Sequence, residues 1–178
     1  MNRYLFTLLV AVSIPVSVSA NPYRHGHTDS SLANAFNIGS DTDGTPLYLC
    51  VTNLYHGTQP GKTWPGHGRC NVAYGGKEYV VNDFKIPSRH LFRSASWKNT
   101  IEGAVVIGKE SNGAPLFLCQ AFFKGSKQPG KTWPGYNHCN ISYAGREIIT
   151  DNYRILGTNN VDGRHHQHSA PRVIVQHG

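Results

Sequence analysis

Two lysines, Lys62 and Lys131, occupy the same place in two copies of one string, Q-P-G-K-T-W-P-G. The ammonium group of a lysine carries three hydrogen-bond donors, which suit sugar hydroxyls or a carboxylate. A lysine is more commonly a solvated surface residue, and this alternative remains open here. The string is identical in both copies, whereas the residues just before it differ, so we interpret the ammonium group as functional.

Other side chains near the lysines could complete a binding site. Asp43 precedes a glycine in the first copy, and Asn112 takes its place in the second. Both are ordinary turn residues, but a carboxylate beside an ammonium would bind vicinal hydroxyls, and the amide of the second copy would make that site weaker. Trp64 and Trp133 could stack on a sugar ring, or they could fill the interface between the two copies.

Catalytic alternatives have less support. Glu78 and Glu147 are carboxylates of the same type in both copies, and two carboxylates can hydrolyse a glycosidic bond. Neither has a local acid–base partner, and each follows a basic residue, so structural ion pairing is the better interpretation. We expect a non-enzymatic protein without a cofactor. The histidines of the C-terminal tail, His165, His166 and His168, are a weak candidate metal site, and no other metal site is expected.

The whole region around the two strings is duplicated with an offset of 69 residues. Residues 35–86 and 104–155 share 22 identities over 52 positions without a gap, which identifies an internal repeat. We divide the chain into a signal peptide (1–20), an N-terminal segment (21–34), repeat 1 (35–86), a linker containing a strand (87–103), repeat 2 (104–156) and a His-rich tail (157–178).

Each repeat has the pattern of β-structure. Short apolar runs begin at Pro46 and Pro115 after Asp-Gly or Asn-Gly turns, and second hairpins surround Gly75-Gly76 and Ala144-Gly145. The proline and glycine of the repeated string predict a rigid connecting loop rather than a helix or a central strand. We therefore expect an all-β fold of two pseudo-symmetric, interlocked modules that share sheets and contain little helix.

Cysteine usage and the N-terminus indicate export. Residues 1–20 combine a basic start, an apolar stretch and small residues at a cleavage site, which predicts a secreted protein, or a periplasmic one in a bacterium. Four cysteines allow three pairings, and the repeat symmetry favours Cys50–Cys70 with Cys119–Cys139. A zinc site is the weaker alternative because the close spacing is missing. The formal net charge of +7 is dispersed and does not indicate nucleic-acid binding.

The ordered set of motifs resembles the DM9 repeat. It comprises Asp43-Gly44 with Leu47-Tyr48, Pro60-Gly61-Lys62, Cys70 to Glu78 and Phe84-Lys85-Ile86, and it recurs from Asn112 to Ile155. The resemblance implies an interlocked all-β unit and a mannose-binding lectin whose sugar contacts are Asp43, Lys62 and Lys131. It implies mannose-like glycans as partners. The chain has no second long apolar stretch, so we expect no membrane insertion, and we keep a homodimer as one candidate assembly. A protein-interaction or effector module is the main alternative, and a glycoside hydrolase is the weaker one.

Overall fold

The computed structural model of the protein describes residues 32–158. The expected signal peptide, most of the N-terminal segment and the three tail histidines lie outside these residues. None of the helices within the described residues is both long and apolar enough to span a membrane.

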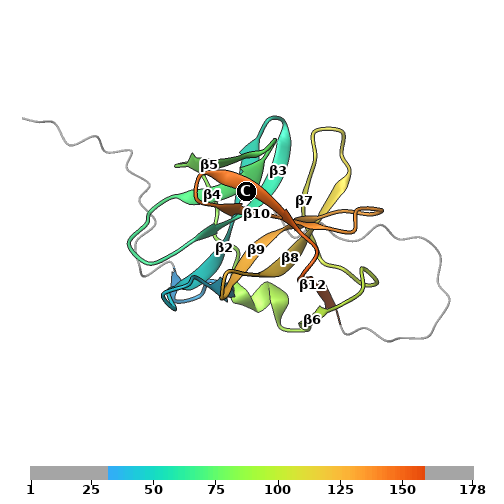
Figure 1. The fold of residues 1–178 in the computed structure, drawn as a ribbon, viewed down its shortest axis with the longest axis horizontal. Coiled ribbons are helices and arrows are strands. Elements are labelled where there is room, and N and C mark those ends of the chain that lie inside the picture. The colour runs from blue at the N-terminus through green and yellow to red at the C-terminus, as the bar shows by residue number, and fades with distance from the viewer. Residues whose placement is uncertain (1–31, 159–178) are drawn as a thin grey trace, which may run out of the picture.

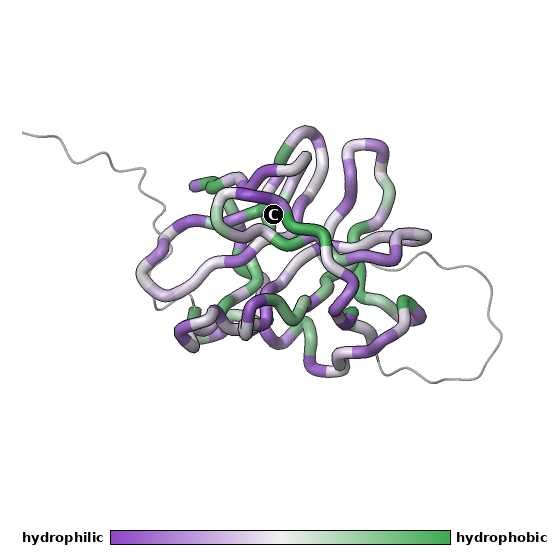
Figure 2. The backbone as a smooth tube through the Cα atoms, viewed as in Figure 1, coloured by the Kyte–Doolittle hydropathy of each residue, from purple (hydrophilic) through white to green (hydrophobic). Residues whose placement is uncertain are grey.

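The fold is all-β, as predicted, and almost every described segment belongs to a strand or a tight turn (Figure 1). Repeat 1 and the linker supply six strands: β1 (Asn37–Ser40), β2 (Pro46–Leu54), β3 (Gly57–Thr63), β4 (Cys70–Tyr74), β5 (Lys77–Val81) and β6 (Ala95–Lys98). Repeat 2 supplies the other six: β7 (Val106–Lys109), β8 (Pro115–Phe123), β9 (Ser126–Thr132), β10 (Cys139–Tyr143), β11 (Arg146–Thr150) and β12 (Tyr153–Thr158). Hydrophobic stretches are short and interrupted by hydrophilic residues, as antiparallel strands with one buried face require (Figure 2).

The two repeats interlock through strand pairs that the duplication makes equivalent. β1 pairs with β9 at Ser40 and Lys127, and β7 pairs with β3 at the equivalent residues Lys109 and Thr58. β5 and β11 also pair with each other across the repeats. Because β2 and β3 pair as well, the strand order closes on itself through both repeats. The prediction of shared sheets is therefore confirmed.

The expected connecting loop is in part a strand, because residues 59–63 of the string complete the central strand β3, whereas residues 64–66 form a turn as predicted. β3 contains Pro60, which faces Val51 on β2, but the backbone of Val51 exchanges its hydrogen bonds with Lys85 (2.9 and 2.8 Å). On the other edge, β3 pairs with β7 at Thr58 and with β4 at Lys62, so Pro60 lies where the partner strand changes. The missing N–H of this proline therefore leaves no ladder position unpaired, and the sequence prediction was wrong for this reason.

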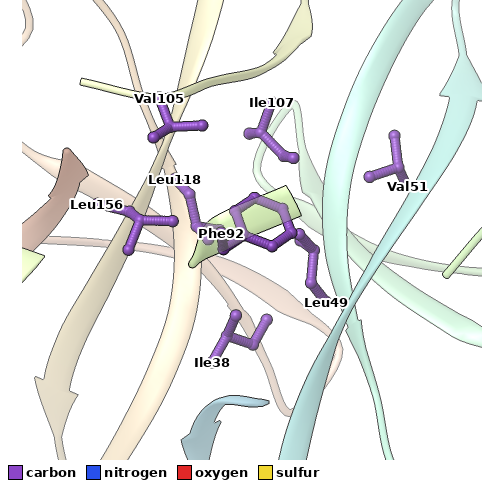
Figure 3. Packing of buried hydrophobic residues seen from close by; sticks show 8 residues of the cluster. All are labelled: Ile38, Leu49, Val51, Phe92, Val105, Ile107, Leu118 and Leu156. Atoms are coloured by element: carbon purple, nitrogen blue, oxygen red, sulfur yellow. The ribbon is translucent and has the colours of Figure 1, made fainter. Parts of the chain in front are cut away.

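The core combines equivalent residues of the two repeats around one residue of the linker. Leu49 and Leu118 are equivalent in the repeat, as are Ile38 and Ile107, and all four are almost fully buried. Phe92 lies between the two sets (Figure 3). Phe92 ends a four-residue 3-10 helix, Arg89–Phe92, so only the last part of the strand expected in the linker forms, as β6.

The disulfides follow the pairing that repeat symmetry favours. Cys50 is bonded to Cys70, and Cys119 is bonded to Cys139. Each bridge joins the long hairpin of a repeat to the strand that follows the repeated string, and no free cysteine remains in the described residues. Two disulfides are consistent with an extracellular protein.

Candidate functional site

Both lysines of the repeated string are buried. Lys62 lies on β3 and Lys131 on β9, with exposed fractions of 4% and 3%. The alternative of an ordinary surface lysine is therefore wrong. A buried ammonium group is costly unless acceptors surround it, so the partners of these two side chains define the site.

Each lysine is held by the glutamine that begins the string in the other repeat. Lys62 Nζ donates to Oε1 of Gln128, and Lys131 Nζ donates to Oε1 of Gln59, both at 2.6 Å. The two glutamines are fully buried. The strings are thus not two independent loops, since the first residue of one completes the environment of the lysine in the other.

The carboxylate near each lysine is not the one that the turn motif suggested. The amide nitrogen of Gln128 donates to Oδ1 of Asp41, and that of Gln59 donates to Oε2 of Glu110, both at 3.1 Å. Asp41 and Glu110 are equivalent in the repeat, and each lies two residues before the position that the sequence analysis selected. The turn motif directed the prediction to the residues before the two glycines, whereas a comparison of charge would have found an acid in both copies at these earlier positions.

Asp43 and Asn112 belong to turns. Oδ1 of Asp43 accepts a hydrogen bond from the backbone N–H of Thr45 (2.8 Å), and Oδ1 of Asn112 accepts one from Ala114 (3.0 Å). The bonds from Thr45 lower the pKa of the exposed Asp43 carboxyl below its ordinary value. The structure thus gives both residues the local role that is common for Asp and Asn before glycine.

A cavity opens beside Lys62. Its volume is about 250 Å³, and side chains from both repeats line it. They offer an ammonium, two carboxylates, an amide, two hydroxyls and two aromatic rings. The lining residues are Asp41, Thr42, Lys62, Trp64, Asn71, Glu78, Tyr143 and Ala144. We call this space the Lys62 cavity. It brings together Lys62 and Trp64, both predicted site residues, whereas Asp43 is not among its lining residues.

Each tryptophan of the string stacks on a ring of its own repeat. Trp64 lies parallel to His67 with ring centroids 3.6 Å apart, and Trp133 lies parallel to Tyr136 at 3.8 Å. These ring partners do not come from the other copy, which counts against the interpretation that the tryptophans fill the interface. Both indoles remain partly exposed.

The two repeat-equivalent glutamates tie the modules together. Glu78 accepts from the amide nitrogen of Asn71 (2.9 Å) and from the backbone N–H of Gly145 in the other repeat (2.7 Å). Glu147 makes the equivalent bonds to Asn140 and Gly76 at the same distances. The expected structural role is thus supported, although the partners are amides rather than the neighbouring basic side chains.

Two tyrosines cover the lysines from the opposite repeat. The Lys131 ammonium lies 4.7 Å from the ring centroid of Tyr74, and the Lys62 ammonium lies 5.5 Å from that of Tyr143. The negative face of an aromatic ring attracts a cation at such distances. Nothing local in the sequence shows that these tyrosines reach the lysine of the other copy.

Burial dominates the electrostatics of both lysines. Desolvation lowers the pKa of Lys62 and of Lys131 below the ordinary value for lysine. Glu78 and Asp41 raise the pKa of Lys62 in part, as Glu110 and Glu147 do for Lys131. Each ammonium therefore sits in a site that is dry enough to strengthen its hydrogen bonds to any group that enters.

The two lysines differ in whether a carboxylate is paired directly with the ammonium group. Oε1 of Glu110 lies 3.5 Å from Lys131 Nζ and forms an ion pair with it. Asp41 is one methylene shorter, and its Oδ1 accepts from the amide of Gln128 and from the backbone N–H of Thr42 (2.8 Å) rather than from the lysine. Lys62 Nζ donates instead to the backbone oxygen of Ser142 (2.5 Å). The carboxylate of the first site is thus not paired directly with its lysine.

The comparison with known proteins agrees with the repeat analysis. The DM9 repeat family matches the chain over residues 5–81 and 41–150. No curated protein matches the chain in sequence. Among solved structures, that of the nematode sperm cell motility protein MFP2B is similar to this fold, with 15% sequence identity and a TM-score of 0.46. This similarity covers 65% of the present chain and 38% of the nematode protein, so the chain spans well under half of that protein's length.

The matched ranges include both copies of the string, both disulfides and every residue of the Lys62 cavity. The resemblance noted in the sequence is thereby confirmed, and the chain belongs to the DM9 repeat family.

Proposed function

We propose that this protein is a secreted, non-enzymatic lectin for mannose-type glycans and that the Lys62 cavity is its main sugar site. The observation that carries the proposal is the triad of buried Lys62, buried Gln128 and half-buried Asp41 at this cavity. The ammonium is bound to the oxygen of the Gln128 amide, and the carboxylate is bound to its nitrogen. A cationic donor and an anionic acceptor are therefore held side by side at the spacing of one amide group.

This pairing is chemically suited to vicinal hydroxyls. One hydroxyl can accept from the ammonium while its neighbour donates to the carboxylate, and the rigid triad requires little ordering when a sugar binds. Gln128 and Ser142 accept two of the three donors of Lys62, which leaves one donor for a ligand. Trp64 supplies an aromatic surface at the same cavity for the apolar face of a pyranose.

The same observations support a binding role over a catalytic one. Glu78 is the second carboxylate of the cavity, and both of its oxygens already accept structural hydrogen bonds, one from Asn71 in its own repeat and one from Gly145 in the other. Sugar hydrogen bonds contribute about 0.5–1.5 kcal/mol each, so we expect weak binding to single sugars and stronger retention on multivalent glycans.

Retention on mannose-agarose, competed by free mannose, tests the proposal. We expect Lys62→Ala with Lys131→Ala to abolish retention, whereas Lys77→Ala with Lys109→Ala removes two exposed lysines and leaves it unchanged. A protein that is not retained, or retention that survives loss of both buried lysines, would refute the lectin proposal and favour a protein-interaction module.

The carboxylate assignment has its own matched pair of variants. We expect Asp41→Asn to weaken mannose binding and Asp43→Asn to leave it unchanged, because only Asp41 is bonded to the glutamine that holds the lysine. The reverse result would restore the assignment to the turn residue.

We further propose that the two sites are unequal, with the Lys62 site the stronger. Glu110 forms an ion pair with Lys131, whereas the second acceptor of Lys62 is an uncharged backbone carbonyl, so a sugar entering the Lys131 site must compete with a carboxylate. Titration of a mannose disaccharide into single variants separates the sites: Lys62→Ala should reduce affinity more than Lys131→Ala. Equal losses would contradict the inequality.

A further inference from the structure

A larger cleft lies in a different part of the molecule, where the linker contacts the beginning of repeat 1. Its volume is about 580 Å³, which is within the usual range for small-molecule sites. The lining residues are Leu32, Ala33, Ala35, Phe36, Asn37, Tyr48, Arg89, His90 and Arg93. We call it the arginine cleft. It shares no lining residue with the Lys62 cavity, and its linker side comes from the segment that is not duplicated.

The charge of the arginine cleft has one sign. Two arginines and a histidine line it, and no carboxylate is among the lining residues. Nε of Arg93 donates to Nδ1 of His90 at 3.0 Å, and one terminal nitrogen of the guanidinium contacts the same ring atom. A guanidinium has five N–H donors, so this contact orients the group and leaves donors for a ligand.

The floor of the cleft is aromatic and fixed by the core. Phe36 stacks on Phe92 with ring centroids 4.3 Å apart and an angle of 18° between the planes. Phe92 is 3% exposed and is the linker residue around which the two repeats pack (Figure 3). Tyr48, on β2, adds a second partly exposed ring. Arg89 therefore begins, and Arg93 directly follows, the short 3-10 helix whose last residue, Phe92, anchors the aromatic floor.

We propose that the arginine cleft is a second binding site, for a sugar ring that carries a carboxylate or a sulfate. The anionic group would contact Arg89 and Arg93, since a guanidinium can bind carboxylate or sulfate oxygens through two parallel hydrogen bonds. The apolar face of the sugar ring would lie on Phe36 and Tyr48. This site is independent of the Lys62 cavity, and its use does not depend on mannose binding there.

Chemical-shift titration of the full secreted chain tests this inference with three probes: glucuronic acid, glucose 6-sulfate and neutral glucose. We expect shifts at cleft residues with one or both acidic sugars, and the two acidic probes distinguish a carboxylate from a sulfate ligand. Arg89→Gln with Arg93→Gln should weaken this binding at least about tenfold, because each lost contact is a hydrogen bond to a charged group.

A matched variant controls for net charge. Arg69→Gln with Lys109→Gln removes two exposed cations outside the arginine cleft and should leave the affinity for the acidic sugars unchanged. Lys62→Ala with Lys131→Ala should also leave it unchanged, which separates this test from that of the lectin proposal. Equal losses in the two charge-matched variants would overturn the inference. So would binding of the acidic sugars no tighter than that of glucose, or shifts confined to residues outside the cleft.

Discussion

Each repeat supplies the glutamine that binds the lysine of the other repeat. This reciprocal contact predicts a strong energetic coupling between each glutamine and its lysine. Gln59 is fully buried, and its side chain makes one hydrogen bond to the ammonium of Lys131 and one to the carboxylate of Glu110. Replacement by leucine keeps most of the volume but removes both bonds. Hydrogen bonds to charged groups contribute about 1.5–3 kcal/mol each, and the leucine recovers part of the loss by burying apolar surface. We expect Gln59→Leu to lower the free energy of unfolding by about 2–4 kcal/mol.

A double-mutant cycle identifies the cause of this loss. With Lys131→Met in place, the buried ammonium is gone, so Gln59→Leu should cost about 1 kcal/mol or less. Urea unfolding of the wild type, both single variants and the double variant gives the coupling energy, and the disulfides should be kept intact throughout. The equivalent cycle with Gln128 and Lys62 provides an internal replicate. Costs that simply add in both cycles would refute the conclusion that each glutamine stabilises the lysine of the other repeat.

Three other outcomes can be checked by unfolding measurements. A Cβ at Gly39 would lie 1.9 Å from the backbone oxygen of Lys127 where the repeats cross, so Gly39→Ala should destabilise the fold by about 3 kcal/mol or more; a stability within error of wild type would contradict this packing. Replacing Cys50 and Cys70 together by serine should lower the free energy of unfolding by about 3 kcal/mol, and an unchanged urea midpoint would speak against a structural bridge. Burial lowers the pKa of both string lysines in the folded protein, so the unfolded chain binds more protons between those lowered values and about 10.5, and stability due to these groups should rise with pH across that window. The rise should be smaller when both lysines are replaced by methionine, and an identical pH profile for the variant would show that their ionisation is not linked to folding.

Part of the candidate site follows directly from the sequence. The duplication of one string identified Lys62, Lys131 and the two tryptophans, and symmetric cysteine spacing together with the export expected from the N-terminus predicted both disulfides. Hairpin turns at Gly75-Gly76 and Ala144-Gly145 were also predictable, because backbone with positive φ favours glycine locally. These features depend on neighbouring residues or on internal symmetry, and both can be recognised in the chain itself.

The environment of the lysines was decided by tertiary structure. Gln128 lies 66 residues from Lys62, and Tyr143 and Ser142 lie still further along the chain, so no local pattern indicates that they meet. The same long-range pairing placed residues 59–63 of the string in a central strand, since the partner strand changes at Pro60.

The sequence by itself thus determined the all-β fold class, the pairing of the cysteines and the residue types that the two repeats share. Only the tertiary structure decided that Asp41 rather than Asp43 approaches the lysine through Gln128, and that one site is closed by the ion pair of Glu110. The physical reason is that turns and hairpins depend on local backbone preference, whereas a buried charge takes its partners from whichever strands the interlocked fold brings beside it.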